Sequence, residues 1–283
     1  MKILVIQNRM GIGDMVIFLP FIEAISKKFN SPITLLSKES SKAKEYLSNN
    51  NHIEKIIDLK RNSNNDYHQG VLGFFRLKKD LKKFNFDKAF IFNSSVRYNL
   101  VCKFARVKEI YQYPLLKKKK QNIIGAAKNL LEKININIDE NPKISIKENL
   151  VVRAKTKYNI NDNQINVLLG IGGSGPTKRT PAKIIIEFIK LSLKNFDCKF
   201  FLAAGNNINE QNILNEIVLN FKEHCVPLNN LSISDTLPII KNCKIAICND
   251  TSFSHLSAAL DIPTIVLMCD SPLLYGSYST KMY

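Results

Sequence analysis

The residues best suited to chemistry lie near the end of the chain, in the stretch Asn249-Asp-Thr-Ser-Phe-Ser-His255. An apolar run at 244–248 precedes this stretch and predicts a buried strand, while residues 253–260 have the spacing of a short helix. Helices often begin at residues such as Thr251. A helix N-terminus after a strand offers free backbone N–H groups and the positive end of the helix dipole, which favours phosphate binding. The alternative is an ordinary capped helix in an α/β domain.

A second candidate anion site lies at a glycine-rich loop in the middle of the chain. The apolar run 164–169 predicts a strand that opens into Gly170-Ile-Gly-Gly-Ser-Gly175, and a helix is predicted from residue 182. Glycines let a ligand approach the backbone closely. Lys178 and Arg179 follow the loop and could bind an anion there. A flexible turn with incidental basic residues is the alternative.

A third candidate lies at the start of the chain, where an apolar strand leads into the loop 8–14 with two glycines. The dinucleotide-binding fingerprint is excluded because its third glycine position is Val16. A helix is predicted over 15–29, with a kink or a late start at Pro20. Asp14 is predicted to be the N-cap of this helix. We expect capping to lower its pKa, because the helix N-terminus favours the ionised carboxylate.

Composition limits the class of protein. The chain has 283 residues, of which 45% are hydrophobic, enough for one or two packed domains. No apolar run approaches the roughly 20 residues of a membrane span, and the first residues do not have the pattern of a signal peptide. The six cysteines form no CxxC pair and several lie in apolar runs, so we expect reduced core cysteines, a cytoplasmic protein and no zinc site. We also expect no other bound metal and no cofactor.

Positive charge is concentrated in the N-terminal half. The net charge is +17, and residues 1–147 hold 28 Lys and Arg against 13 Asp and Glu. An excess of this kind indicates an anionic partner. The predicted helix 73–84 is amphipathic and basic, and residues 117–120 are four lysines, so both segments could contact an anionic membrane surface. Solvated lysines on an outer face are the commoner explanation.

The order of predicted elements indicates two doubly wound α/β domains. Each half contains four strand–loop–helix units, and a linker is predicted at 139–147, so we divide the chain into 1–147 and 148–283. Ligands of such sheets bind beyond the carboxyl ends of the strands. The polar residues 93–97, which follow a predicted strand at 88–92, lie at such an end.

Several of these residues together form a pattern that resembles glycosyltransferase family 9, the heptosyltransferases of lipopolysaccharide core assembly. The resemblance extends over residues 2–278. The residues that carry it are Gly13-Asp14, Pro20, Lys178-x-x-Pro181, Asp250-Thr-x-x-x-His255, Ala258-Ala-Leu260 and Pro263.

The resemblance implies a GT-B fold of two Rossmann-like domains with the active site in the cleft between them. It implies an inverting, metal-independent transfer of heptose from an ADP-sugar to an anionic glycolipid of the lipopolysaccharide core type. The basic N-terminal domain would bind the acceptor and the C-terminal domain the nucleotide sugar. The protein would then be cytoplasmic, with peripheral contact to the inner face of the cytoplasmic membrane.

The resemblance also implies roles for particular residues. Asp14 would be the general base on the acceptor hydroxyl, Lys178 would hold the diphosphate, and Asp250 would contact the donor sugar. The backbone N–H groups of residues 251–253 would bind the phosphates, and Glu210 would bind the ribose. The full set of predicted substrate-binding residues is Gly13, Lys178, Arg179, Glu210, Asp250, Thr251, Ser252, Phe253 and His255.

The chain departs from the family pattern in three places. Ser252 stands where the family usually has glycine, and Thr180 where it often has tryptophan. The chain stops at Tyr283, before the final helix that the family usually packs on its first domain.

Two other classes of function stay open at this level. One is a GT-B transferase or epimerase that uses another nucleotide sugar. The other is a non-catalytic basic binding protein. Nucleic-acid binding is disfavoured, because the chain has no groove-reading motif and no tryptophan to stack on bases.

Overall fold

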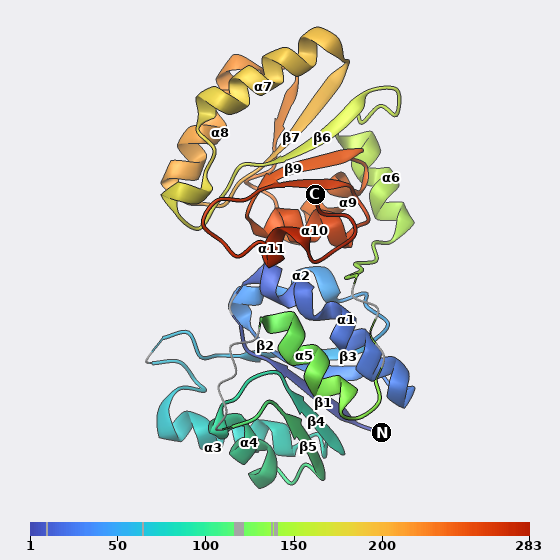
Figure 1. Ribbon diagram of the computed structural model, residues 1–283, viewed down its shortest axis with the longest axis vertical. Helices are drawn as coiled ribbons and strands as arrows, with labels where there is room; N and C mark the ends of the chain where they lie inside the picture. The colour runs from blue at the N-terminus through green and yellow to red at the C-terminus, as the bar shows by residue number, and fades with distance from the viewer. Residues whose placement is uncertain (10, 64, 116–121, 137, 139–140) are drawn as a thin grey trace. The chain divides into compact units, whose positions relative to one another are not determined.

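The computed structural model describes residues 1–9, 11–63, 65–115, 122–136, 138 and 141–283, and it divides into two compact units (Figure 1). These units are Met1–Glu140 and Asn141–Tyr283. Each contains one parallel sheet of five strands with helices on both faces. The two doubly wound α/β halves expected from the sequence are confirmed.

The segment after the predicted linker belongs to the second unit. The side chain of Asn141 accepts a hydrogen bond from the backbone N–H of Thr280 at 2.9 Å. The backbone N–H of Ile144 donates to the carbonyl of Ala259 at 2.8 Å. Sequence analysis divided the chain after residue 147, whereas these contacts join residues 141–147 to the second unit.

The first unit has the strand order β3-β2-β1-β4-β5. Its strands are β1 (Ile3–Gln7), β2 (Ile33–Lys38), β3 (Ile53–Leu59), β4 (Lys88–Ile91) and β5 (Glu109–Gln112). Its helices are α1 (Ile12–Phe29), α2 (Ala43–Leu47), α3 (Gly70–Lys82), α4 (Val96–Phe104) and α5 (Ile123–Glu132), with a 3-10 turn, η1 (Glu39–Ser41).

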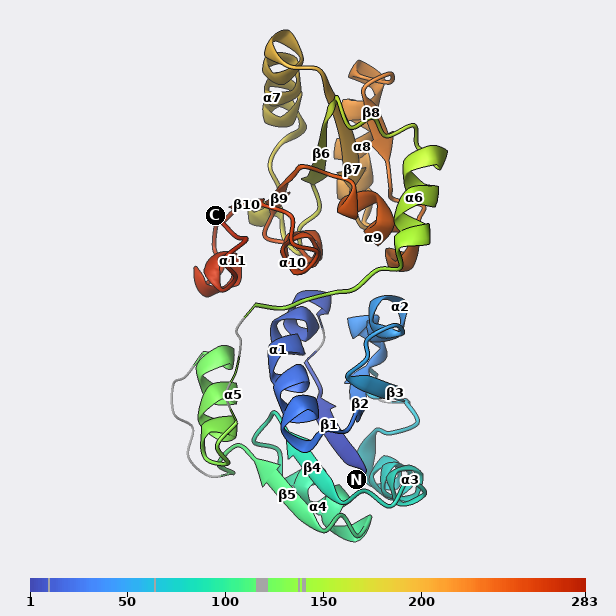
Figure 2. The ribbon, with the colours of Figure 1, turned by 90° about the vertical axis from the view of Figure 1, so that its right-hand side faces the viewer.

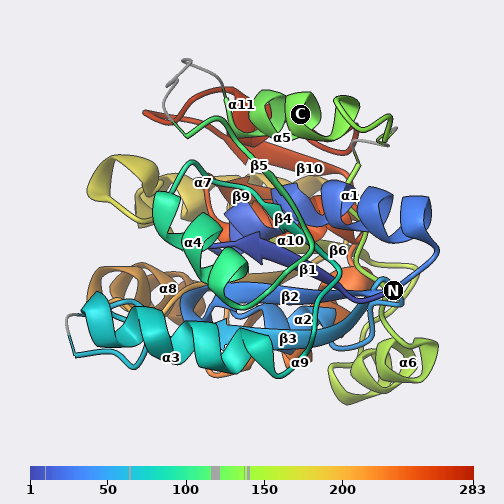
Figure 3. The same cartoon turned by 90° about the horizontal axis from the view of Figure 1, so that it is seen from below.

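Helices cover both faces of this sheet. Figure 2 shows α5 beside α1, and Figure 3 shows α3 with α4. All five residues of β1 are buried, which explains its unbroken apolar run, because a central parallel strand packs against helices on both sides. Leu77 and Leu81 of α3 and Val101 of α4 are buried against the strand residues Leu4 and Ile6.

Two details of the first unit differ from expectation. Helix α1 begins at Ile12, so the late start predicted from Pro20 is wrong, and Pro20 is buried inside the helix. The structure also adds α4 and the edge strand β5, which the sequence analysis did not identify.

The second unit has the strand order β10-β9-β6-β7-β8. Its strands are β6 (Ile165–Gly170), β7 (Cys198–Ala203), β8 (Cys225–Pro227), β9 (Ile245–Asn249) and β10 (Thr264–Leu267). Its helices are α6 (Glu148–Lys157), α7 (Ala182–Asn195), α8 (Ile208–Asn220), α9 (Ile233–Lys241), α10 (Ser252–Ala259) and α11 (Leu274–Ser277), with a 3-10 turn, η2 (Pro176–Lys178).

In this unit α7 and α8 cover one face of the sheet, and α6, α9 and α10 lie on the other (Figure 1). Ile185 and Ile189 of α7 and Ile217 of α8 pack against the strand residues Val167 and Phe200. The carboxyl ends of β6 and β9 lie next to each other, because Gly170 pairs with Cys248. Polar residues that follow these two strands are therefore brought together.

Three further expectations concern surface and composition. The lysines 117–120 lie outside the described residues. Five of the cysteines are buried as expected, whereas Cys269 is exposed. Within the described ranges, no helix is long and apolar enough to cross a membrane.

Candidate active site

An ion pair at the carboxyl edge of the second sheet forms the centre of the candidate site. Lys178, the last residue of η2, donates to Oδ2 of Asp250, just after β9, at 2.7 Å. Ser271, four residues beyond β10, accepts from the Lys178 ammonium and donates to the same carboxylate oxygen. A second carboxylate, Asp270, lies 4.0 Å from the ammonium and accepts from Thr177 at 2.8 Å.

The pair keeps both groups charged. The hydrogen bond to Asp250 raises the pKa of Lys178 above its ordinary value. Burial alone would raise the pKa of Asp250, but the hydrogen bonds from Lys178 and Ser271 outweigh burial and hold it below its ordinary value. An ammonium has three N–H donors, and these contacts use two of them. One donor is left for a ligand.

A polar network supports the loop that carries Lys178. The side chain of Asn249, the last residue of β9, donates to the carbonyls of Ile171 at 3.0 Å and Gly172 at 3.2 Å. The hydroxyl of Thr180 donates to the Asn249 side-chain oxygen at 2.7 Å. The chain thus uses a small hydroxyl, where the resemblance leads one to expect tryptophan, to attach the loop after β6 to the end of β9.

The glycine loop is also fixed from the other side. Arg179 donates through Nε to the carbonyl of Gly173 at 3.0 Å. Glu210, in the first turn of α8, accepts from the backbone N–H of Gly173 at 3.2 Å and of Gly205 at 2.6 Å. A Cβ on Gly172 would lie 2.6 Å from a Glu210 carboxylate oxygen, so a larger residue there would displace this carboxylate. Glu210 is 8% exposed, and its carboxylate holds two loops together.

The predicted phosphate site is the N-terminus of α10, which begins at Ser252 as an eight-residue helix. Thr251 is its N-cap, and the Thr251 hydroxyl accepts from the backbone N–H of Phe253 at 3.0 Å. One of the three N–H groups assigned to phosphate is therefore already bonded within the chain. The backbone N–H groups of the first helical turn have no partner inside the helix. Those of Ser252 and Ser254 can therefore donate to a phosphate.

His255 lies behind this helix start and not at its surface. Its ring is 4% exposed, stacks on Tyr278 at 5.6 Å, and shares a hydrogen bond of 3.0 Å between Nδ1 and the Tyr278 hydroxyl. Burial lowers the pKa of His255 to about 4, and the nearby charge of Asp250 only partly opposes this effect. The imidazole is therefore neutral at physiological pH, and its contacts with Tyr278 attach α10 to the segment that follows α11.

Asp14 belongs to the other unit and sits in the first turn of α1. The N-cap of α1 is Gly11, so Asp14 is the third helical residue, next to Gly13, and the expectation of Asp14 as N-cap is wrong. Its carboxylate accepts from the backbone N–H of Gly11, which is the return half of a capping box. Its Oδ1 lies 3.7 Å from the Arg9 guanidinium.

The environment of Asp14 reverses the expected direction of its pKa. Its side chain is 21% exposed, and burial raises the pKa above the ordinary value of an aspartate. The charge of Arg9 and the hydrogen bond to Gly11 lower it, but they do not outweigh burial. The sequence-based expectation of a lowered pKa considered the helix N-terminus and not desolvation. A carboxylate with a raised pKa is a stronger base once it is ionised.

The structure brings together Lys178, Arg179, Glu210 and Asp250 with the start of α10, all in the second unit. Asp14 and Gly13 lie in the first unit. Ser271 was not predicted from the sequence. Polar residues that follow a strand are candidates for ligand contacts, as residues 93–97 were, and this rule would also have found Ser271.

Comparison with known proteins places the chain in a family. The model of glycosyltransferase family 9 (heptosyltransferase) matches residues 74–281. Lipopolysaccharide heptosyltransferase 1 of Campylobacter coli is 25% identical over 145 residues, a match that spans 49% of this chain and 41% of that relative.

Solved structures share the fold over nearly the whole chain. The E. coli ADP-heptose lipopolysaccharide heptosyltransferase II has a TM-score of 0.75 at 18% identity, covering 96% of this chain and 86% of its own. A family 9 glycosyltransferase of Veillonella parvula has a TM-score of 0.78 at 16% identity, covering 96% and 82%. At these identities the likeness concerns the fold alone, which is that of the GT-B glycosyltransferases with two Rossmann-like halves. Since the family model matches most of the chain, the protein belongs to glycosyltransferase family 9.

Proposed function

We propose that the protein transfers a heptose, or a related sugar, from an ADP-sugar to a glycolipid acceptor of the lipopolysaccharide core type, with inversion and without a metal. The observation that carries the proposal is the Lys178–Asp250 pair beside the N-terminus of α10, in a member of this family. An E. coli heptosyltransferase of the same fold has been solved with ADP. This ligand is the basis for choosing an adenine nucleotide.

The second unit would bind the donor. The remaining N–H donor of Lys178 and the N–H groups at the start of α10 would hold the diphosphate and stabilise the charge that develops as it leaves. These groups supply the positive charge that a metal provides elsewhere. Asp250 would contact the donor sugar, and Arg179 would add charge at the same loop. Glu210 would bind the ribose with the lone pairs that its two backbone contacts leave over.

The first unit would bind the acceptor and supply the base. The ionised Asp14 carboxylate would take the proton of the acceptor hydroxyl as the new sugar bond forms. The raised pKa of Asp14 favours this role, because proton transfer to a more basic carboxylate is less uphill. Gly13, which has no side chain, would let the acceptor approach the backbone at the helix start. Inversion follows if the hydroxyl attacks opposite the leaving diphosphate in a single displacement.

Helix α3 would hold the protein at the inner face of the cytoplasmic membrane. Val71, Leu72 and Phe75 on this helix are 74%, 70% and 58% exposed. Lysines 78, 79, 82 and 83 line a shallow hollow together with Phe75. Exposed apolar side chains next to several cations suit an anionic lipid surface, where the acyl boundary and the headgroups are both within reach.

A panel of nucleotide sugars tests the donor assignment. Calorimetry in EDTA should show binding of ADP-heptose and ADP, and much weaker binding of UDP- and GDP-sugars. A preference for a UDP-sugar would instead support a transferase or epimerase of the same fold. No binding of any nucleotide sugar would overturn the proposal.

A further inference from the structure

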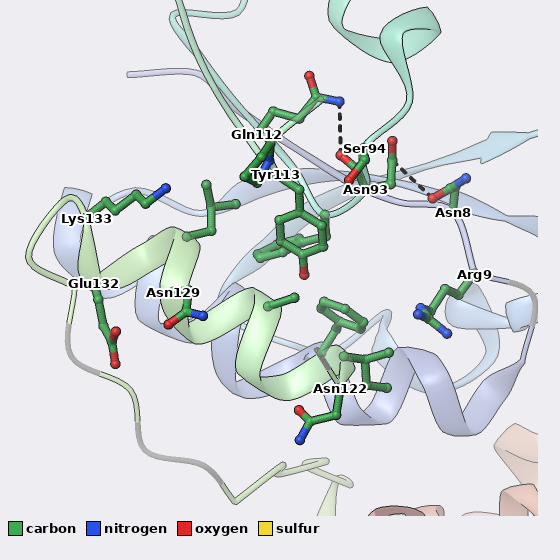
Figure 4. A pocket seen from close by; sticks show the side chains of 16 residues that line it. Asn8, Arg9, Asn93, Ser94, Gln112, Tyr113, Asn122, Asn129, Glu132 and Lys133 are labelled. Carbon is green, nitrogen blue, oxygen red and sulfur yellow. Dashed lines mark hydrogen bonds between the residues drawn. The ribbon is translucent and has the colours of Figure 1, made fainter. Parts of the chain in front are cut away.

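The two units differ in what the proposed reaction leaves unexplained. In the first unit, a pocket lies at the carboxyl ends of β1, β4 and β5, with α5 as its wall (Figure 4). This unit would already bind the acceptor, so the pocket belongs to the proposed reaction. In the second unit, the outward face of α7 carries apolar and charged side chains that none of the roles above uses.

Three large apolar side chains form a row on α7, which lies on the outside of the second sheet (Figure 1). They are Ile184, Phe188 and Leu191, which are 52%, 37% and 64% exposed. Residues three or four apart lie on one face of a helix, so the three are neighbours. Phe196, just past the last helical residue, adds a further exposed apolar side chain.

Packing within the second unit does not account for this row. Single exposed apolar side chains are ordinary on a protein surface, whereas a row of them on successive turns of one helix is typical of a face that packs on a partner. Phe188 also reaches the core, where its ring centroid lies 6.2 Å from that of Phe200. The residues that α7 buries against the sheet are Ala182, Ile185, Ile186 and Ile189.

Two opposite charges lie along one edge of the row. Glu187 follows Ile184 by three residues and Lys194 follows Leu191 by three, so both lie on the same side of it. Both are exposed, and neither forms an ion pair with another described residue. The exposed apolar face of α3 differs, because the lysines beside it would repel a second copy. The face of α7 presents both signs of charge.

We propose that the protein pairs with a second copy of itself through α7, with the two helices antiparallel. A two-fold axis joins the same surface of both copies. An axis midway between Glu187 and Lys194 places Glu187 opposite Lys194 of the partner subunit, and the symmetry forms this ion pair twice. A parallel arrangement would put the charged edges of the two helices on opposite sides of the seam, where no pair forms. The charges therefore select the antiparallel arrangement.

The same register also matches the apolar row with itself. Leu191 lies next to the axis and packs on Leu191 of the partner subunit. Phe188 lies two residues, or about 3 Å along the helix, from the partner's Leu191. Ile184 points toward the end of the other helix, where Phe196 of the partner subunit lies. One surface thus supplies both the apolar seam and the charges that fix its register.

The size of this surface indicates a weak dimer. Each subunit contributes one helix of 14 residues. Such an interface belongs to the small class that buries less than about 1,200 Å² in total, so the dimer should form only as the protein concentration rises. The donor residues lie outside the seam, because Lys178 precedes α7 and Asp250 follows β9. ADP binding is therefore independent of pairing.

Sedimentation velocity tests the self-association directly. Over an about hundredfold range of protein concentration, the whole chain should pass from monomer to dimer by mass action. Nothing larger should form, because a two-fold interface closes on itself. A monomer at every concentration, or assembly beyond the dimer, would overturn the proposal.

Two apolar-to-acidic variants locate the interface. Leu191→Glu should raise the dissociation constant of the dimer at least about tenfold, because it buries a charge in the apolar seam. Val152→Glu is the matched control, since Val152 is 53% exposed on α6, at the other face of the sheet. It should leave the dimer unchanged. Dimerisation that survives Leu191→Glu, or that Val152→Glu weakens equally, would exclude α7 as the interface.

Charge reversal tests the register. Glu187→Lys alone and Lys194→Glu alone each place like charges opposite one another at both ends, so each should weaken its own dimer by about tenfold. A mixture of the two variants restores opposite charges at both ends. Sedimentation of one labelled variant with the other should therefore show a mixed dimer about as tight as the unaltered one. A mixed dimer no tighter than either variant alone would overturn the antiparallel register.

ADP calorimetry on the same samples separates this inference from the proposed function. The dissociation constant for ADP should be the same in all four variants as in the unaltered protein. Loss of ADP binding in the reversed-charge variants would contradict the independence of the two surfaces.

Discussion

Lys178 and Asp250 form a 2.7 Å ion pair although 72 residues separate them in the sequence. The loop after β6 carries the lysine, and the turn after β9 carries the aspartate. The register that pairs Gly170 with Cys248 brings these two loops together. A cation held in this way beside a helix N-terminus is suited to a diphosphate, and it leads to the first two predictions.

Lys178→Ala should weaken ADP binding. A charge-assisted contact to phosphate is lost, which corresponds to about 1.5–3 kcal/mol, or roughly a tenfold to hundredfold rise in Kd. Calorimetry in EDTA measures the change, and Lys183→Ala, an exposed lysine at the start of α7, is the control. An unchanged Kd, or binding that requires Mg²⁺, would remove Lys178 from its role.

Asp250→Asn separates two roles of this carboxylate. The change frees the Lys178 ammonium from its counter-charge, so the affinity for ADP should stay the same or rise. Turnover should fall, because the neutral amide is a weaker contact for the donor sugar. Steady-state kinetics with ADP-heptose, next to calorimetry with ADP, show both effects. A loss of ADP affinity that equals the loss of turnover would mean that Asp250 only holds the loop in place.

Asp14→Asn should remove the general base and keep the fold. Asparagine has nearly the same shape but cannot accept the proton, so kcat should fall by roughly 10²–10⁴-fold. Donor affinity should stay near that of the unaltered protein, because the donor contacts lie in the other unit. Normal turnover would reduce Asp14 to a residue of the capping box.

The stability of the same variant reports on the pKa of Asp14. The folded-state pKa is raised above the ordinary value of about 3.9, so this carboxyl stabilises the fold below that pH and loses the contribution as pH rises through the folded pKa. Asparagine removes this dependence. Chemical unfolding at neutral pH should therefore show a change of no more than about 1 kcal/mol. A large loss at neutral pH but none at pH 3 would contradict the raised pKa.

Substitution of the four lysines 78, 79, 82 and 83 by glutamine should weaken binding to anionic vesicles by at least about tenfold, since each lysine near the surface contributes about 1 kcal/mol. Raised salt should release the unaltered protein, because exposed charges are screened over about 8–10 Å. Vesicle cosedimentation measures both effects. The same number of substitutions at lysines 183, 190, 194 and 222, which are exposed in the second unit, is the matched control. Binding that persists in high salt would reduce the lysines to solvated charge.

The sequence predicted the elements with strong patterns. The strand predicted at 164–169 is β6, which is shifted by one residue, and the helix predicted from residue 182 is α7, which begins at Ala182. The edge strand β5 was not predicted, because its four residues, Glu-Ile-Tyr-Gln, contain no apolar run and are half-buried or exposed. Helix α4 (Val96–Phe104) follows the polar residues 93–95, and its apolar residues show only weak helical periodicity, so it could not be told from a loop.

For the candidate site, the sequence predicted the residue types but not their contacts or burial. The residue types at 178 and 250 stood out, but their contact depends on strand order and register, which a single sequence does not show. The direction of the Asp14 pKa depends on how deeply the side chain is buried, and α1 begins two residues before it. Burial of His255 against Tyr278 depends on a contact across 23 residues.

The proposed reaction transfers a sugar from an ADP-sugar with Asp14 and Lys178 and without a metal. The most direct measurement is mass spectrometry of a lipopolysaccharide-core glycolipid that lacks heptose, after incubation with ADP-heptose in EDTA. We expect a product one heptose heavier, with an inverted anomeric configuration as measured by NMR, and almost no product with Asp14→Asn or Lys178→Ala. Retained configuration, a strict need for Mg²⁺, or as much product from either variant as from the unaltered protein would contradict this mechanism.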